Sequence, residues 1–364
     1  MMTECVILGG GISGLLCARE LAISGWRVSV LERAEIGREA SWAGGGILSP
    51  LYPWRQPEPI ERLSRWSQQY YPALSESLAR ASGIDPQWQR CGMLWLNLED
   101  FDAAAQWCRG LRIDWDSPDS NEIEKIQPGL RRMVGGHPLW VPGIAQIRNP
   151  RMLKALKQDL RQRGVALKDK TPVTGFRFSG GRVVAVQTPG EEIRSDVFVV
   201  TAGAWSSQWL MDDLWQPKIR PVKGQMLLIN ARPKLLSTMV QQGQHYLIPR
   251  LDGRILSGST VEEAGFDKRP TETAYQSLYR FAVETLPALK AFPVALQWAG
   301  LRPAAPDGIP YIGRHPQLAN LYYNCGHFRN GVIMGPAASR LLADLVLDRT
   351  PILDPAAFSP ENRL

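Results

Sequence analysis

The chain has 364 residues, which is too long for one ordinary hydrophobic core and predicts about two domains. Hydrophobic residues make up 44% and charged residues 21%, a globular composition that excludes wholesale disorder. The net charge of +7 permits a nucleic-acid partner, but the cations are dispersed through the chain, so we expect a solvated basic surface and no nucleic-acid partner. No apolar run reaches the roughly 18 residues of a membrane-spanning helix, so no membrane is expected either.

The cysteines and histidines argue against disulfides and metal sites. The five cysteines are odd in number and lack CxxC spacing, and none of the four histidines is paired at metal-ligand spacing. We therefore expect reduced thiols, a cytoplasmic location and no metal.

The N-terminal segment predicts a strand, a helix and a second strand. Residues 4–8 are a short apolar run, residues 12–24 have helical periodicity that ends at Gly25, and residues 27–31 alternate between apolar and polar. Such a βαβ unit implies a parallel sheet.

The middle of the chain mixes clear elements with poorly patterned ones. Residues 37–59 are loop-like, a polar helix is expected over 59–82, and the mixed segment 84–145 is assigned to a second domain. An amphipathic helix is expected over 150–163. Strands then follow at 166–167, 174–178, 182–188 and 196–201, with a hairpin turn at Gly180-Gly181 and a helix through Leu210.

The last third predicts an α+β unit and a return to the first domain. It has strand patterns at 225–229, 246–249 and 254–257, one helix over 272–285 and a final apolar helix over 332–347. The expected fold is α/β, a Rossmann-type nucleotide-binding domain on a parallel sheet with an inserted α+β substrate domain on an antiparallel sheet. The nucleotide-binding domain is expected to comprise 1–83, 146–216 and 301–364, and the substrate domain 84–145 and 217–300.

A glycine-rich turn follows the first strand. Gly9, Gly11 and Gly14 fit the pattern G-x-G-x-x-G, in which the glycines allow a tight turn, a close approach to a pyrophosphate and close packing of helix on strand. Glu32, at the end of the second strand, can accept hydrogen bonds from the ribose hydroxyls. The acid favours FAD or NAD over NADP.

A second glycine cluster lies at 40–48, too late in the chain to belong to the pyrophosphate turn. Its apolar flanks suggest backbone packed against a flat ring, and the isoalloxazine of FAD fits that role. A nicotinamide enzyme does not need this second segment, so FAD is the expected cofactor.

Two late segments carry the remaining polar chemistry. Arg302 stands in Gly300-Leu301-Arg302-Pro303, which we interpret as a stiff, proline-bounded turn. Residues 326–331 form a polar, glycine-bracketed turn that opens onto the final helix, whose positive end would face the ring. A guanidinium is the side chain best suited to clamp a carboxylate with two parallel hydrogen bonds.

On these motifs the chain resembles the D-amino acid oxidase superfamily of FAD enzymes, and within it the bacterial glycine oxidases of thiamine biosynthesis. The resemblance spans essentially the whole chain. The matching stretches are residues 9–14 with Glu32, 40–48, 171–173, 199–206, 221–225, 246–250, 298–303, 311–316 and 326–331.

The resemblance implies where the cofactor and the substrate bind. Val173 would contact the flavin nucleotide through its backbone, and residues 327–333 would wrap the ring. The cofactor-binding set is expected to be Gly9, Gly11, Ile12, Ser13, Gly14, Glu32, Arg33, Ala40, Ser41, Gly45, Gly46, Ile47, Val173, His327, Phe328, Arg329, Asn330, Gly331, Val332 and Ile333. Arg302 would clamp the substrate carboxylate, assisted by the hydroxyl of Tyr246, with Arg329 close to the same substrate.

The activity implied is oxidation of glycine, and of sarcosine or small D-amino acids, by hydride transfer from the α-carbon to flavin N5. Dioxygen would be the acceptor, giving glyoxylate, ammonia and hydrogen peroxide, and the glycine imine would serve thiamine thiazole synthesis. Two alternatives remain open from the sequence: an FAD-dependent D-amino acid dehydrogenase and a tRNA-modifying oxidase of the same superfamily. The resemblance also implies a homo-oligomer, a tetramer.

Two positions depart from relatives in the superfamily. Sarcosine oxidases attach FAD through a cysteine near Gly300, so the FAD is expected to be non-covalent here. Val261 replaces a larger methionine of the glycine oxidases, and we expect it to form the third wall of the substrate pocket and to admit modestly larger N-substituted glycines.

Overall fold

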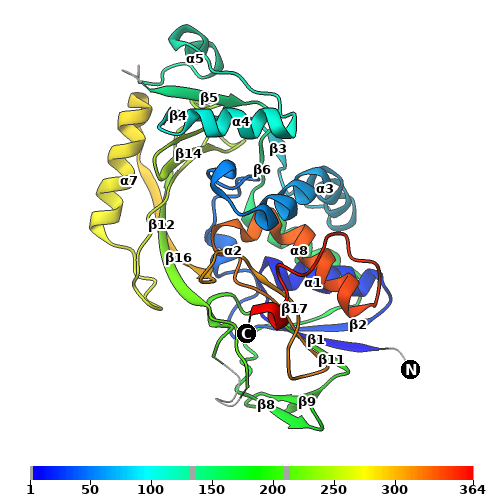
Figure 1. Ribbon diagram of the computed structural model, residues 1–364. Helices are drawn as coiled ribbons and strands as arrows, with labels where there is room; N and C mark the ends of the chain where they lie inside the picture. Colours follow the sequence, from blue (N-terminus) through cyan, green and yellow to red (C-terminus); the bar gives the residue numbers. More distant parts are fainter. Residues whose placement is uncertain (1–2, 132–135, 209–213, 364) are drawn as a thin grey trace.

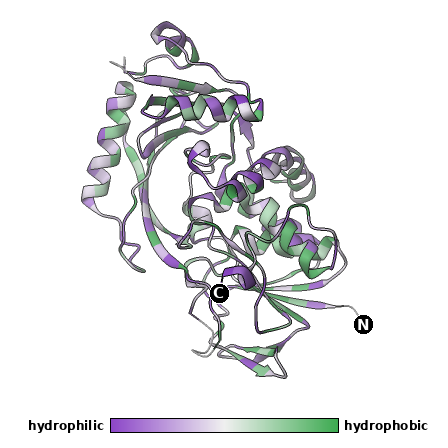
Figure 2. Cartoon of the chain, viewed as in Figure 1, coloured by the Kyte–Doolittle hydropathy of each residue, from purple (hydrophilic) through white to green (hydrophobic). Residues whose placement is uncertain are grey.

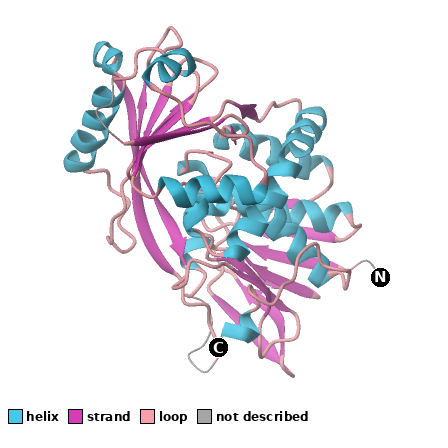
Figure 3. Cartoon of the chain, turned by 45° about the horizontal axis from the view of Figure 1, so that its top comes forward, coloured by secondary structure: helices cyan, strands magenta, loops and turns pink. Residues whose placement is uncertain are grey.

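The computed structural model describes residues 3–131, 136–208 and 214–363. Two large sheets stand at opposite ends of the molecule, with a group of helices between them (Figure 1, Figure 3). One sheet has six strands and the other has seven.

The six-stranded sheet is built around the N-terminal strand β1 (Glu4–Leu8), which is almost wholly apolar and buried. Its strand order is β17-β18-β11-β1-β2-β7, parallel throughout except for the antiparallel edge pair β17–β18. The other strands are β2 (Arg27–Leu31), β7 (Ala166–Lys168), β11 (Val197–Val200), β17 (Tyr311–Arg314) and β18 (Leu321–Cys325).

Four helices cover this sheet and fill the centre of the molecule: α1 (Ile12–Ile23), α3 (Glu58–Ser82), α6 (Asn149–Gln162) and α8 (Gly331–Val346). Figure 2 colours α1 and α8 mostly as hydrophobic, and their buried side chains share one core with the sheet. A buried ion pair between Arg19 of α1 and Asp159 of α6, at 3.0 Å, ties two of these helices together. Gly83, at φ 69°, ends α3 in the left-handed conformation that glycine adopts most easily.

The seven-stranded sheet has the order β16-β12-β15-β14-β13-β4-β5 and is antiparallel apart from the parallel pair β13–β4. Helix α7 (Glu272–Thr285) lies along its outer side in Figure 1, and α4 (Phe101–Leu111) and α5 (Ser120–Ile126) lie at its far end. Its strands are β4 (Met93–Leu98), β5 (His137–Val141), β12 (Arg220–Ile229), β13 (Met239–Gln242), β14 (His245–Pro249), β15 (Ile255–Gly258) and β16 (Val294–Ala304).

The remaining elements are short. A three-stranded sheet, β8 (Gly175–Ser179), β9 (Arg182–Gln187) and β10 (Glu192–Arg194), turns at Gly180 and Gly181, both at positive φ. Strands β3 (Gln89–Arg90) and β6 (Ala145–Gln146) pair with each other. The single-turn helices are α2 (Ala40–Ala43), η1 (Pro53–Arg55), η2 (Gly203–Trp205), η3 (Pro287–Ala291), η4 (Phe328–Asn330) and η5 (Pro360–Arg363).

The predicted fold class is confirmed, but one prediction at its centre is wrong. Residues 300–303 are not a turn: they belong to strand β16, which pairs with β12 from Val222↔Arg302 through Gly224↔Gly300 and beyond. The local sequence, with glycine and proline, favours a turn, whereas the long pairing with β12 overrides it. Strand β16 also crosses the domain boundary expected between residues 300 and 301, and the division into domains stays a proposal.

Two further differences concern loops. The segment expected to be irregular at 37–59 contains the short helices α2 and η1. The helix expected through Leu210 falls partly outside the described residues, and its described part is the single turn η2. Within the described residues, no helix is long and apolar enough to cross a membrane.

Candidate active site

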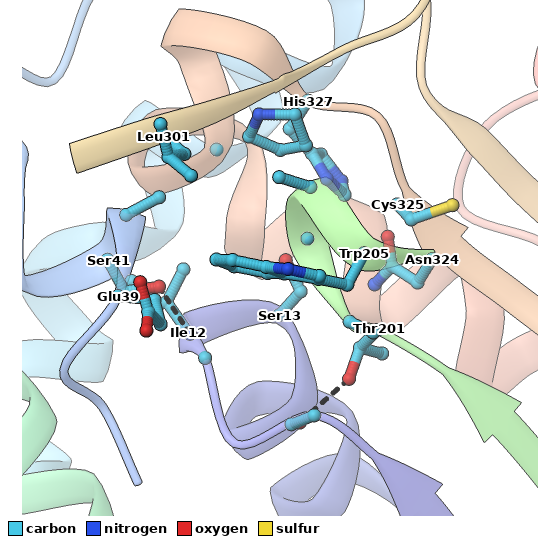
Figure 4. A pocket seen from close by; sticks show the side chains of 18 of the residues that line it. Ile12, Ser13, Glu39, Ser41, Thr201, Trp205, Leu301, Asn324, Cys325 and His327 are labelled. Atoms are coloured by element: carbon cyan, nitrogen blue, oxygen red, sulfur yellow. Dashed lines mark hydrogen bonds between the residues drawn. The ribbon is translucent and has the colours of Figure 1, made fainter. Parts of the chain in front are cut away.

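A cavity of about 1140 Å³, including its open mouth, lies at the carboxyl ends of the parallel strands. Gly9 follows β1, Glu32 follows β2, and Thr201 follows β11, and all three line it. This edge of an open α/β sheet is where such folds bind ligands. In Figure 4 the start of α1, with Ile12 and Ser13, lies on one side of the cavity, and Leu301 and His327 lie on the opposite side.

The first glycine turn leaves no room for side chains. Gly9 has φ +115°, and a Cβ there would lie 2.6 Å from the Thr201 carbonyl oxygen. A Cβ on Gly14 would lie 2.0 Å from the Gly9 carbonyl oxygen, so Gly14 holds helix α1 against the turn and does not itself line the cavity. The Thr201 hydroxyl donates to the Gly9 carbonyl at 2.8 Å and fixes the turn (Figure 4).

Glu32 is held as a buried carboxylate at the same edge. One of its oxygens accepts from the Gly10 amide at 2.9 Å and the other from the Ala34 amide at 3.0 Å. Each carboxylate oxygen has a second acceptor position, so Glu32 can still take hydrogen bonds from a diol in the cavity. Arg33 beside it lines the cavity and places its guanidinium 3.5 Å from the ring centre of Trp205.

The second glycine segment forms a shared wall between this cavity and a smaller chamber. Ala40 and Ser41 line the larger cavity, and the Ser41 hydroxyl accepts from the Ile12 amide at 2.8 Å (Figure 4). Gly45, Gly46 and Ile47 line the smaller chamber.

The turn before α8 closes the other side of the larger cavity. His327 is 3% exposed, and burial lowers its pKa to about 4. Its Nε2 atom is buried and has no hydrogen-bond partner within the described part of the chain. The ring is therefore neutral at physiological pH and has one free polar atom. The other members of the turn that line the larger cavity are Phe328, Arg329, Gly331 and Val332.

Val173, Asn330 and Ile333 differ in their placement. Val173 lines the larger cavity, and Asn330 lines the smaller chamber. Ile333 is 1% exposed and packs in the core shared by the six-stranded sheet and its helices, so the structure does not bring it to either cavity wall.

The smaller chamber, of about 690 Å³ with its opening, adjoins the larger cavity and contains Arg302. The Arg302 guanidinium donates from Nη2 to the Ser259 hydroxyl at 2.8 Å, and from Nη1 to the Thr260 and Lys223 carbonyl oxygens at 3.0 and 3.3 Å. Burial lowers its pKa to about 10, so it stays charged at neutral pH. Three of its five N–H groups point at these acceptors, and the others are left for the Tyr246 hydroxyl and a ligand.

Gly224 allows this arrangement. It faces Gly300 across the β12–β16 pair, and a Cβ on Gly224 would lie 2.2–2.4 Å from the Arg302 guanidinium atoms. Any side chain at Gly224 would therefore displace the guanidinium.

The chamber also brings together Tyr246 and Arg329. Tyr246 comes from β14, Arg302 from β16 and Arg329 from the turn η4, so three elements far apart in the sequence meet there. Burial lowers the pKa of Arg329. Its Nε has no hydrogen-bond partner among the residues that the structure describes, and its Nη2 lies 3.5 Å from the Gln244 side-chain oxygen.

One expectation about the chamber walls is wrong. Val261 is 41% exposed and lines neither cavity, so it is not the third wall. That wall is formed by Met226 and Ser259. Met226, Ser259 and Gly224 were not among the site residues predicted from the sequence. The one signal for Gly224 was that it lies in the matching stretch 221–225, which pairs with the matching stretch 298–303.

A glycine turn at the end of a parallel strand, a buried acid after the next strand and an adjoining cationic chamber together define a dinucleotide-binding enzyme. Residues 4–345 match the family model described as FAD dependent oxidoreductase, so the chain belongs to that family. It is 45% identical to a glycine oxidase of Pseudomonas aeruginosa over 369 residues, with all of both chains covered. It is 32% identical to the bifunctional protein ThiO/ThiG of Trichormus variabilis, over 96% of this chain and 53% of that protein. The crystal structure of glycine oxidase from Geobacillus kaustophilus superposes with a TM-score of 0.92 at 28% identity, covering 98% of both chains.

The residues of the larger cavity fit FAD. The glycine turn and the start of α1 offer backbone amides to a pyrophosphate, Glu32 offers acceptors to a ribose, and His327 leaves a buried polar atom that a ligand can satisfy. Among the described lining residues the one cysteine is Cys325, and burial raises the pKa of its thiol to about 12. A Cβ on Gly300 would lie 2.5 Å from the Ala43 Cβ, so that position has no room for a side chain.

Proposed function

We propose that the protein is an FAD-dependent glycine oxidase that also acts on sarcosine and small D-amino acids. The observation that carries the proposal is the buried Arg302 guanidinium in a chamber that adjoins the FAD cavity. The names of the relatives support glycine as the substrate and a role in supplying glycine imine to thiamine thiazole synthesis. They do not favour a D-amino acid dehydrogenase or a tRNA-modifying oxidase.

Arg302 binds the substrate carboxylate in this proposal. Its position is fixed by Ser259, Thr260 and Lys223, so little freedom is lost when the carboxylate binds. Tyr246 and Arg329 stand in the same chamber and complete the proposed set of residues around the substrate. The proposed cofactor-binding residues are the set expected from the sequence; its members line one of the two cavities, except that Gly14 supports the turn and Ile333 supports α8.

The amine must lose its proton without a dedicated base. Among the described residues that line the chamber there is no aspartate, glutamate or histidine. The two guanidiniums disfavour a bound ammonium, so the amine binds in its neutral form after giving its proton to water. FAD, when bound, accepts the hydride equivalent from the α-carbon and passes the electrons to dioxygen. The imine then hydrolyses to glyoxylate and ammonia, and peroxide is the second product.

Close packing behind one wall keeps the chamber small. Gly45 lines the chamber, and a Cβ there would lie 2.7 Å from the Ile248 side chain. Substrates with small α-substituents therefore fit best.

The test is an anaerobic titration of the purified holoenzyme with glycine. We expect the flavin absorbance to bleach and to recover on admission of air, with equal amounts of peroxide and glyoxylate. Arg302→Gln should retain the flavin spectrum and raise the glycine KM by about 10- to 100-fold, the value of one charge-assisted pair. Bleaching without recovery would identify a dehydrogenase, and failure to bleach with glycine, sarcosine or D-alanine would overturn the proposal.

The proposal includes non-covalent FAD, a cytoplasmic location and a homotetramer. The five free cysteines and the absence of a side chain at Gly300 support the first two points. Release of free FAD on acid precipitation and the mass of the holoenzyme in solution test the cofactor linkage and the tetramer.

A further inference from the structure

Arg250, the residue that follows strand β14, is a buried cation without a carboxylate partner. It is 6% exposed, and burial lowers its pKa to about 10, so it stays charged at neutral pH. Within the described part of the chain no carboxylate pairs with it, whereas Arg19, which is 4% exposed, pairs with Asp159 at 3.0 Å. Because an unpaired buried charge destabilises a fold, its retention points to a role beyond packing.

The Arg250 guanidinium holds the second glycine segment from behind. Its Nη2 donates to the Gly45 carbonyl oxygen at 2.7 Å, and its Nη1 donates to the Gln146 side-chain oxygen at 2.6 Å and to the Ile147 carbonyl oxygen at 3.3 Å. Gly45 lines the smaller chamber, whereas Arg250 lines neither cavity. The cation therefore lies directly behind the chamber wall, separated from it by one peptide group.

The bond to Gly45 fixes the direction of the next amide. The peptide between Gly45 and Gly46 is trans, so its N–H points away from its carbonyl oxygen. Because that oxygen faces Arg250 behind the wall, the Gly46 N–H faces the chamber, which Gly46 also lines. No described residue accepts from this amide, while the Gly46 carbonyl accepts from the Ile147 amide at 2.8 Å. The wall thus offers one free donor of fixed direction to a ligand.

The charge of Arg250 strengthens that donor. A cation bonded to a carbonyl oxygen polarises the peptide group, so the N–H at the other end becomes a better hydrogen-bond donor. The cation also favours negative charge on the chamber side of the wall, because buried surroundings screen it weakly. The ring of FAD gains negative charge when it accepts a hydride, so this arrangement favours the reduced cofactor.

We propose that Arg250 is a positioning residue that directs the Gly46 amide toward bound FAD and stabilises the negative charge that the flavin ring acquires on reduction. The inference rests on the FAD-dependent oxidase function proposed above and adds to it a residue that favours reduction without contacting the substrate. Loss of the charge should lower the reduction potential of the flavin, while a carboxylate still binds to Arg302.

The test uses sulfite, which adds reversibly to the oxidised flavin ring, leaves a negative charge on it and removes its yellow colour. In FAD-loaded Arg250→Gln we expect the sulfite dissociation constant to rise by about 10-fold or more and the reduction potential to fall. Arg250→Lys keeps the charge and should recover most of the sulfite affinity. Acetate, which binds at Arg302 and does not add to the ring, should bind both variants within about threefold of the wild type.

Arg148→Gln is the matched control. Arg148 is a neighbouring cation, but it has its own carboxylate partner, Asp252, at 3.1 Å and lines neither cavity. The same change from arginine to glutamine should there leave the sulfite dissociation constant within about twofold of the wild type. If Arg250→Gln does not retain FAD, Arg250→Met, which fills a similar volume without charge, replaces it with the same expected result.

Three results would overturn the inference. The first is a sulfite dissociation constant within about twofold of the wild type in an FAD-loaded neutral variant, which would leave Arg250 as a structural tie alone. The second is an equal loss of sulfite affinity in Arg250→Lys and Arg250→Gln, and the third is an equal loss of acetate affinity, which would mean that the wall is distorted. None of these depends on an amino acid substrate, so failure of glycine to bleach the flavin contradicts the proposed function and not this assignment.

Discussion

Replacing Gly224 with alanine should greatly weaken carboxylate binding although it replaces none of the proposed ligand-binding side chains. The new methyl group would lie 2.2–2.4 Å from Nη1, Nη2 and Cζ of Arg302, whereas ordinary contacts begin at 3.4 Å. The guanidinium must therefore retreat by about 1 Å, a shift that breaks the alignment of a charge-assisted pair. Gly224 lies in a strand and is not at positive φ, so the backbone itself tolerates alanine.

The expected loss follows from the strength of that pair. A hydrogen bond to a charged group contributes about 1.5–3 kcal/mol, which corresponds to roughly 10- to 150-fold weaker binding of the carboxylate. The dissociation constant of acetate, read from the flavin spectrum, and the KM for glycine should both rise by this factor.

Gly110→Ala is the matched control, because a Cβ there would meet no described atom within 4 Å outside its own stretch of helix α4. It should leave acetate binding unchanged and raise the melting temperature slightly, since alanine favours a helix over glycine by roughly 1 kcal/mol. If Gly224→Ala retains FAD and binds acetate within twofold of the wild type, the assignment of Arg302 as the clamp is refuted.

Three other changes have directions fixed by the structure. His327 has a folded pKa of about 4 against an ordinary 6.5, so the unfolded chain takes up its proton first and stability is lost as the pH falls below 6.5. Urea unfolding of the wild type should lose about 2 kcal/mol more between pH 7 and pH 5 than that of His327→Gln, and parallel losses would contradict this. Lys268→Ala removes an ion pair with Glu39, which lines the FAD cavity, so FAD release followed by flavin fluorescence should quicken by about two- to fivefold; an unchanged rate would exclude a role in retention. Glu262→Gln removes a negative charge close to Arg302, so acetate should bind a few-fold more tightly, and weaker binding would show that Glu262 acts by positioning.

Local signals predicted one part of the fold accurately. Strands β1 and β2 have the predicted bounds, and α1 ends one residue early, because an apolar run, a glycine turn and a helical period all lie within the first 31 residues. Glu32 entered the predicted site for the same reason, because it directly follows the second of these strands. These features need no partner from elsewhere in the chain to be recognised.

The substrate chamber depends on pairings that no local pattern encodes. Arg302 was expected in a turn because glycine and proline flank it, yet β12 pairs with it from 80 residues away, at Val222↔Arg302. Met226 and Ser259 are brought to the chamber by the pairing of β12 with β15. No motif in the sequence around either residue indicates that it lines the substrate chamber. Val261 shows the converse, since two residues beyond Ser259 the chain already faces solvent.

The pairing of β1 with β11, a strand made much later, sets the order in which the molecule can assemble during its synthesis. Leu8 pairs with Val200 of β11, and β11 pairs in turn with β18, where Val200 faces Tyr323. At roughly 5–20 residues per second, a ribosome needs about 10–40 s to reach β11 after making β1, and longer to reach β18. The glycine turn after β1 is thus the first segment of the site to be made, but its neighbouring strands are completed only much later. Until then β1 remains an apolar strand without its β11 partner and can aggregate.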